Sequence, residues 1–276
     1  MLAGLVVAAF LPAPAVLAQT LPLWIMGLIA VAVTRMQPLS SKHMTPRALW
    51  SALALLAFLP VSCIAVVTLW RMGGLPEVYV LPLIAFLAAP PISGAANLCL
   101  ILGYDARMAL LATVLGTLAT PVIAVLCVVA LGVELETSVA ALAVRVTAIV
   151  GLGVALGLVV RRVAQGWVSA HGTGLDGLSV LLMIAFLFPV FDGAIAMVQA
   201  DPMLALGMVS LAFVLNLGGH LLVRSFASRA AGLCFGNRNA GLYFAILPFE
   251  PGLSLFVALY QIPMYLTPLI FKRLDR

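Results

Sequence analysis

The sequence has very little charge. Lys, Arg, Asp and Glu make up 8% of the 276 residues, whereas 64% are hydrophobic; a soluble domain carries about 25% charged residues. So few charges cannot cover a surface against water, which excludes soluble enzymes, nucleic-acid-binding proteins and disordered proteins. The apolar stretches are also longer than the roughly ten alternating residues of a barrel strand. Together with a mean hydropathy of +1.23, this indicates an all-α integral membrane protein whose partner is the lipid bilayer, with no nucleic acid.

The sequence also lacks the side-chain groupings that catalysis and metal binding require. Its four cysteines stand singly within apolar segments, without a CxxC motif, so neither disulfides nor a zinc site are expected. The aspartates are isolated from one another, and no HExxH, GxSxG or GxxxxGK[ST] motif occurs. We therefore expect no cofactor, and we expect that the protein is not an enzyme.

Charged and turn-rich breaks divide the chain into ten apolar segments, which we interpret as ten membrane spans; segment 2–18 is short and is the weakest of them. They cover residues 2–18, 21–36, 48–70, 75–103, 107–131, 139–160, 177–198, 203–223, 228–249 and 251–271. No Lys or Arg precedes Arg35, and a secretory signal needs a basic start, so segment 2–18 is interpreted as a membrane helix. The prediction is a single membrane domain over residues 1–276.

The distribution of charge predicts the orientation. Most of the 14 basic residues fall in alternate loops and in the C-terminal tail, whereas the opposite loops contain Arg71 and most of the acids. Basic residues concentrate in cytoplasmic loops. We therefore expect a multi-pass protein of the cell (inner or plasma) membrane with both termini in the cytoplasm, and the net charge of +5 reflects topology.

Two segments, five helices apart, are interrupted by helix-breaking residues. The fourth contains Pro90-Pro91-Ile92-Ser93-Gly94, and the ninth contains Gly236-Asn237-Arg238-Asn239-Ala240-Gly241. Five spans per half invert the second half relative to the first, and matching breaks in inverted halves indicate a transporter binding site. The repeats would cover roughly residues 1–131 and 139–271. Alternatively, the glycines and prolines only kink the helices or permit close packing.

At these breaks the sequence resembles the bile acid:sodium symporter family. The fourth segment matches the family's proline–glycine crossover at Pro90, Pro91, Gly94 and Asn97, with Ala96 at the serine position. The ninth segment, Cys234 to Leu242, resembles the family's Glu-x-Gly-x-Gln-Asn-Ser-Gly-Leu motif. Further similarity lies at Thr113, Thr117, Thr120 and Pro121, at Asn216-Leu217-Gly218, and at Tyr260-Gln261, which corresponds to a His-Asn pair.

The resemblance implies ten helices in two inverted repeats, with broken helices four and nine crossing. Helices one, two, six and seven would form a panel, and helices three to five and eight to ten a core. It also implies a substrate site formed by Asn97, Thr113, Arg238, Asn239, Tyr260 and Gln261. The backbones would approach one another at Pro91, Ser93, Gly94, Gly236 and Gly241.

The departures from the family pattern concern sodium. The family's sodium-binding glutamate and serine correspond to Cys234 and Ala96, and a thiol is a poor ligand for a hard cation. The sodium site is therefore expected to be degenerate, and sodium coupling is not expected. Arg238 instead brings a charge to membrane depth, which is costly and indicates a functional site. It would replace the sodium charge and pair with a substrate carboxylate, or it would only bind carbonyls of the broken fourth helix.

We therefore expect a secondary transporter that carries a small organic anion by alternating access without sodium coupling. One alternative is a sodium-dependent organic anion or bile acid symporter. Another is a membrane protein that senses a ligand and does not transport it.

Overall fold

The computed structural model describes residues 13–35, 45–133, 138–245 and 250–275. Within these ranges the regular structure is helical apart from one isolated bridge between Pro91 and Arg238. Six helical segments are long and apolar enough to cross a membrane: Pro46–Met72, Ala106–Ala130, Val139–Val163, Gly172–Ala200, Pro202–Phe226 and Pro251–Leu274. The prediction of a multi-pass α-helical membrane protein is confirmed.

The elements follow the predicted apolar segments. They are α2 (Ala15–Gln19), α3 (Leu21–Arg35), α4 (Pro46–Met72), η1 (Glu77–Tyr79), α5 (Val80–Leu87), α6 (Ala95–Leu102), α7 (Ala106–Ala130), α8 (Val139–Val163), α9 (Gln165–Ala170), α10 (Gly172–Phe191), α11 (Ala194–Ala200), α12 (Pro202–Phe213), η2 (Val214–Gly218), α13 (Gly219–Phe226), α14 (Arg229–Gly236), η3 (Ala240–Ala245) and α15 (Pro251–Leu274). Most of the predicted first segment, 2–18, lies outside the described residues, as do residues 134–137 and 246–249.

Several helices begin where a polar side chain can accept a hydrogen bond from a free backbone amide. Thr45, Asp105, Ser138, Asp201, Ser228 and Glu250 cap α4, α7, α8, α12, α14 and α15 in this way. Pro46, Pro202 and Pro251 follow three of these caps, at a position where no amide hydrogen bond is lost. The caps explain why the helices begin at these points.

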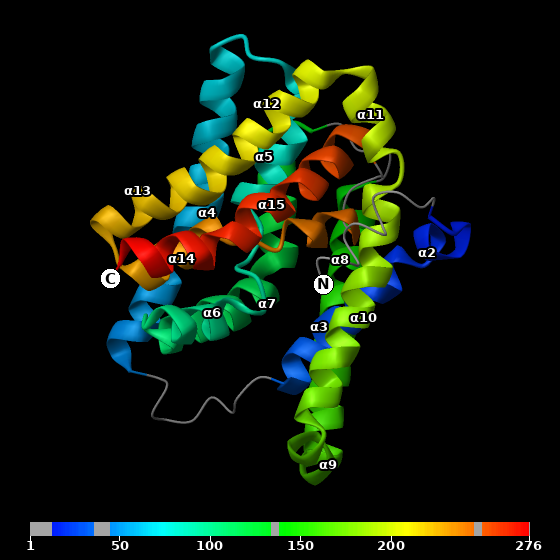
Figure 1. The fold of residues 1–276 in the computed structure, drawn as a ribbon, viewed down its shortest axis with the longest axis vertical. Coiled ribbons are helices and arrows are strands. Elements are labelled where there is room, and N and C mark those ends of the chain that lie inside the picture. The colour runs from blue at the N-terminus through cyan, green and yellow to red at the C-terminus, as the bar shows by residue number, and fades with distance from the viewer. Residues whose placement is uncertain (1–12, 36–44, 134–137, 246–249, 276) are drawn as a thin grey trace.

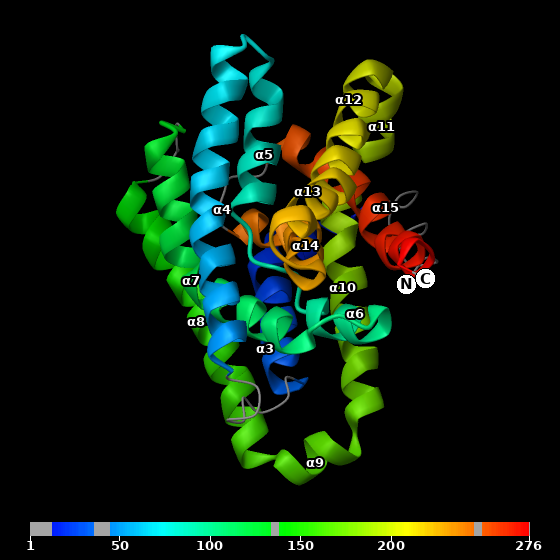
Figure 2. The ribbon, with the colours of Figure 1, turned by 90° about the vertical axis from the view of Figure 1, so that its left-hand side faces the viewer.

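One group of helices is built on α3. The α8 and α10 helices flank it and are joined by the short α9 at one end of the molecule (Figure 2). Two glycines allow the approach of α8: a Cβ added to Gly157 would lie 2.6 Å from the Ala30 carbonyl oxygen, and one added to Gly153 would lie 3.0 Å from that of Met26. The Thr34 hydroxyl also donates to the Gly157 carbonyl at 3.2 Å. These contacts join α3 and α8 closely.

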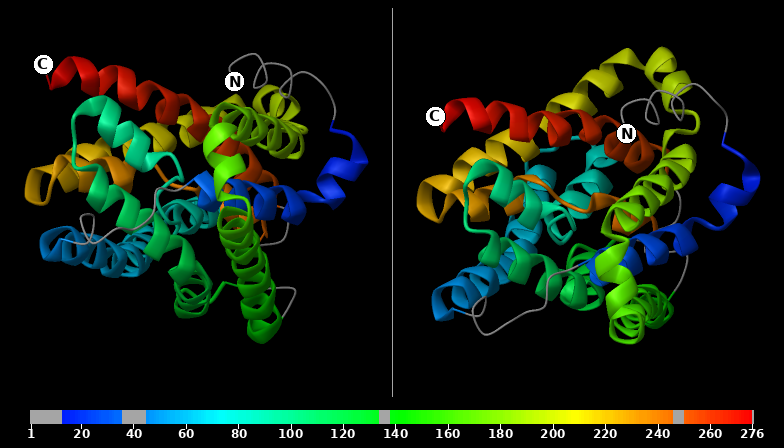
Figure 3. Two further views of the ribbon diagram at one scale, coloured as in Figure 1. Left: turned by 90° about the horizontal axis from the view of Figure 1, so that it is seen from below. Right: turned by 60° about the horizontal axis from the view of Figure 1, so that its bottom comes forward.

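The remaining helices form a second group. The long α4 packs along α7, and α12 and α13 pack with α14 and α15 (Figure 1). Seen from below, α3 and α10 lie to one side and α4, α13 and α15 to the other (Figure 3). The short helices α5, α6 and α14 end or begin in the interior of this arrangement, so the fourth and ninth segments are interrupted helices.

Three features differ from the simple segment pattern. The short helix α9 lies in a predicted loop, and α10 begins at Gly172, earlier than the hydropathy pattern indicates. The eighth segment contains a π-helical turn, η2, in which Asn216 turns its side chain to the ninth segment. Such turns arise from tertiary contacts that hydropathy does not record.

Candidate functional site

The two interruptions lie against each other. The amide of Ile92 donates to the carbonyl of Asn237 at 3.0 Å, and the amide of Asn239 donates to the carbonyl of Pro90 at 2.9 Å. Pro91 and Arg238 thereby form an antiparallel bridge. Backbone groups freed by a broken helix need partners at membrane depth, and here each break supplies partners for the other. We call this contact the junction.

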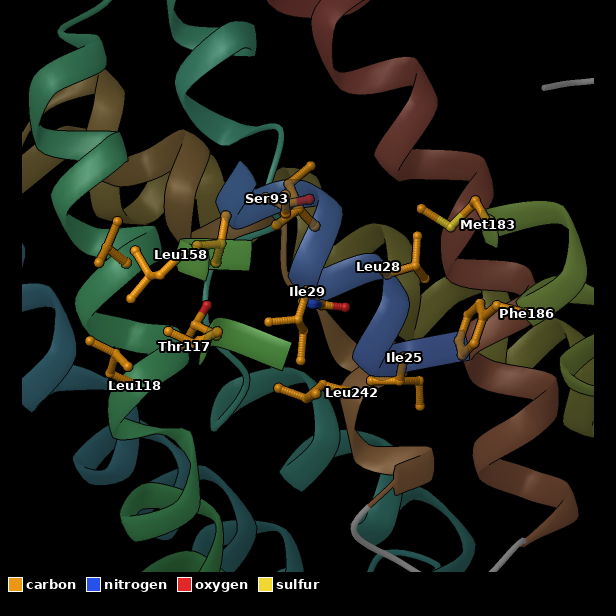
Figure 4. A pocket seen from close by; sticks show the side chains of 17 residues that line it. Ile25, Leu28, Ile29, Ser93, Thr117, Leu118, Leu158, Met183, Phe186 and Leu242 are labelled. Atoms are coloured by element: carbon orange, nitrogen blue, oxygen red, sulfur yellow. The ribbon is translucent and has the colours of Figure 1, made fainter. Parts of the chain in front are cut away.

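An apolar pocket of about 210 Å³ lies beside the junction. Its walls come mainly from α3, α7, α8 and α10, and Figure 4 shows Ile25, Leu28, Met183 and Phe186 around the space. Its polar lining residues are Ser93, Thr117 and Asn239. The pocket therefore combines a hydrocarbon-like surface with a few polar groups, which is the usual composition of a small-molecule site.

A second, polar cavity of about 890 Å³ adjoins the first. Ser93 and Ala32 line both spaces. From there the cavity runs past Asn97 to Arg107 and to Arg35, which makes a bidentate ion pair with Asp176. The first turn of α6, which no side chain caps, forms part of its wall.

Asn97 and Asn239 are the two members of the predicted substrate set that line these spaces: Asn97 the polar cavity, Asn239 the apolar pocket. Thr113 is buried, and its hydroxyl donates to Ala109 at 2.8 Å and to the Ile92 carbonyl at 3.4 Å. Gln261 is also buried and donates to the carbonyl of Val257 at 3.2 Å.

Arg238 and Tyr260 lie within the protein beside the junction. Arg238 is 1% exposed. Its Nε donates to the carbonyl of Phe235 at 2.8 Å and its Nη1 to that of Ala89 at 3.1 Å. The Tyr260 hydroxyl donates to the carbonyl of Gly236 at 2.9 Å and accepts from the Arg238 amide at 2.7 Å. These two side chains bind the freed backbone and line neither cavity.

The predicted backbone residues fall on both sides of the junction. Pro91 belongs to the bridge, and Ser93 and Gly94 face the polar cavity. Gly236 packs closely: an added Cβ would lie 2.4 Å from the Asn216 carbonyl oxygen. Gly241 lines the apolar pocket, where an added Cβ would lie 2.6 Å from the ring of Phe186.

The residues expected at the degenerate sodium site have different surroundings. Ala96 lines the polar cavity. Cys234 is fully buried on α14, and its thiol lies near that of Cys99 on α6. Cys63 and Cys127 form a similar contact between α4 and α7. All four thiols are buried and free, so they form two helix–helix contacts that their spacing did not predict.

Sequence reasoning missed the apolar walls of the pocket and the role of Asn216. The Asn216 carboxamide donates to the Gly236 carbonyl at 2.5 Å and accepts from the Thr267 hydroxyl at 2.6 Å.

No family model matches the chain, and no curated protein is significantly similar to it. The family resemblance thus stays a prediction that rests on the motifs in the sequence.

Proposed function

We propose that the protein is a secondary transporter that carries a small organic anion with an apolar body by alternating access. The junction at the meeting of two cavities is the observation that carries the proposal. A solute that enters the polar cavity reaches Ser93, which also lines the apolar pocket. Interrupted helices at membrane depth are typical of transporter binding sites.

The charge on this path favours an anion. Arg107 and Arg35 line the polar cavity and are exposed. Gly94, Ala96 and Asn97 at the start of α6 line the same space, and the N-terminal end of a helix favours an anion. Arg35 at the end of α3, Arg107 at the start of α7, and Arg161 and Arg162 at the end of α8 favour a cytoplasmic position for these helix ends by the positive-inside rule. The described conformation would then be open to the cytoplasm.

The composition of the apolar pocket indicates the chemistry of the uncharged part of the anion. Most of its lining side chains are hydrocarbon, with hydroxyl or amide groups at Ser93, Thr117 and Asn239. A compact apolar body would replace water in the pocket, while the acidic group stays near Ser93 and the α6 amides. Inorganic anions and polyanions would lack this apolar contact.

The test combines binding and flux. The purified protein is heated with each of a panel of organic anions, and the anions that stabilise it are then offered to proteoliposomes. A ligand at 100 times its dissociation constant adds roughly 2.7 kcal/mol to the stability of the folded state. We expect stabilisation by apolar monoanions and saturable uptake of the same compounds. Stabilisation without uptake would indicate a ligand sensor, and neither effect with any anion would refute the proposal.

Two variants locate the site. Ser93→Ala and Asn239→Leu remove polar groups from the pocket wall, and each is expected to weaken anion affinity by about 3- to 10-fold, the worth of one hydrogen bond. Ser169→Ala is the matched control, because Ser169 is exposed on α9 and its hydroxyl bonds only to Gln165. Equal affinities in all three variants would place the site elsewhere.

A further inference from the structure

The Arg238 side chain lies where two broken helices end. It donates to the carbonyl of Ala89, just beyond α5, and to that of Phe235, in the last turn of α14. Its guanidinium also lies 4.7 Å from the centre of the Phe235 ring, where a cation is attracted to the aromatic face. Three different groups of the junction therefore contact one positive charge.

The charge compensates the two helix ends. Each helix C-terminus carries a partial negative charge of about half an elementary unit, so two converging ends amount to roughly one unit. The described ion pairs all lie elsewhere, at Arg35, Arg71, Arg224 and Arg229. Within the described chain, Arg238 thus has carbonyl oxygens and helix ends in place of a carboxylate partner.

An inorganic cation bound by these helix ends would compete with Arg238 for the same carbonyl oxygens. Carbonyl ends of interrupted helices are the groups that bind coupling cations in transporters, and a hard cation such as sodium requires several oxygen ligands. The two side chains that the resemblance places at the sodium site carry no oxygen: Cys234 ends in a thiol, and Ala96 has only a methyl group. Of the oxygens at the junction, the carbonyls of Ala89 and Phe235 already accept hydrogen bonds from the guanidinium, which holds them without a metal ion.

We infer that Arg238 is a fixed internal cation that substitutes for a coupling cation, so that anion binding and transport need no sodium. This inference rests on the proposed function, since it specifies how that carrier is energised. Arg238 acts here as a positioning residue: it stabilises the junction against which the anion binds. Because the charge is covalently attached, it remains at the junction through every transport cycle.

The experiment measures anion binding and uptake in sodium, potassium and choline chloride at equal ionic strength. The unmodified protein is expected to give the same affinity and rate in all three salts. Binding or uptake only in sodium would overturn the inference and leave the proposed carrier function intact. Failure of every anion in every salt would instead overturn the proposed function, so the two failures are distinguishable.

Variants at position 238 separate charge from packing. Arg238→Lys retains the positive charge and is expected to retain cation-independent uptake at a reduced rate. Arg238→Gln retains a hydrogen-bond donor without the charge, and its anion affinity in choline should fall by roughly 10- to 100-fold, the worth of a charge-assisted hydrogen bond. Equal affinity of Arg238→Gln and the unmodified protein in choline would overturn the inference. If the variants do not fold, the salt comparison on the unmodified protein still decides.

Discussion

The carboxylate of Asp275 accepts a hydrogen bond from Arg224 at 2.7 Å and thereby joins the end of α15 to α13. The Tyr104 hydroxyl, in the connection between α6 and α7, donates to the other carboxylate oxygen. Tyr104 also lines the polar cavity. The C-terminal end of the chain is therefore fastened to the wall of the cavity that leads to the junction.

The contribution of the Asp275 contacts to the stability of the folded state should depend on pH. Burial alone would raise the pKa of Asp275, but the hydrogen bonds from Tyr104 and Arg224 and the nearby positive charges lower it below 3.8. A lowered pKa stabilises the folded state above 3.8, and the stabilisation is lost as the pH falls through the folded-state pKa. Asp275→Asn should reduce stability at neutral pH by about 1–2 kcal/mol and flatten the decline in melting temperature on the acid side.

The matched control for that variant is Asp105→Asn. Asp105 caps α7, and asparagine is an equally good capping residue, so this change should leave the stability at neutral pH nearly unchanged. A steep acid decline that persists in Asp275→Asn would show that other carboxylates cause it.

The ion pair at the polar cavity should affect entry of the anion more than stability. Arg35 and Asp176 have exposed fractions of 38% and 61%, and an exposed pair contributes at most about 1 kcal/mol. Asp176→Asn releases the Arg35 charge, so initial uptake of the anion should rise at low salt and return to the unmodified rate at high salt. Asp201→Asn makes the same charge change at the cap of α12, outside the cavity, and should not alter uptake. A salt-independent change would contradict an electrostatic cause.

The approach of α8 to α3 should be sensitive to one methyl group. In Gly157→Ala the new Cβ would meet the Ala30 carbonyl at 2.6 Å and the Val33 side chain at 2.7 Å, which should destabilise the protein by about 1–3 kcal/mol. Gly151→Ala on the same helix meets nothing within 4 Å and should be neutral or slightly stabilising. Thermal unfolding in detergent measures both, and equal melting temperatures would show that α3 and α8 are not packed this closely.

The Asn216 contact can be tested through its partner. Thr267→Val removes the hydroxyl that donates to the Asn216 carboxamide at 2.6 Å, which leaves a buried oxygen without this donor and should cost about 1–3 kcal/mol. The control is Thr120→Val, because the buried Thr120 hydroxyl bonds only to Gly116 of its own helix. If both variants lose the same stability, the link between α15 and the π-helical turn contributes nothing of its own.

Some of this arrangement is predictable from sequence, because certain residues restrict the backbone. Proline and glycine at 90–94 and 236–241 interrupt their helices, and polar caps such as Asp105 and Ser138 set helix starts. The apolar pocket was not predictable: Ile25 and Phe186 carry no signal in a chain that is 64% hydrophobic. Nor does sequence show which way a polar side chain turns. Thr113 and Tyr260 bind backbone carbonyls in the interior, because backbone groups freed at membrane depth need partners within the protein.

The two hydrogen bonds of the junction, from Ile92 to Asn237 and from Asn239 to Pro90, join main-chain atoms on both sides. Main-chain amides and carbonyls persist through almost any substitution, whereas a site held by side chains is lost when one of them changes. The central contact of the molecule can therefore survive extensive sequence divergence, provided that residues 239 and 92 do not become proline. Mutation could exchange the side chains around it, and with them the solute preference of the proposed carrier, while the main-chain contact stays the same.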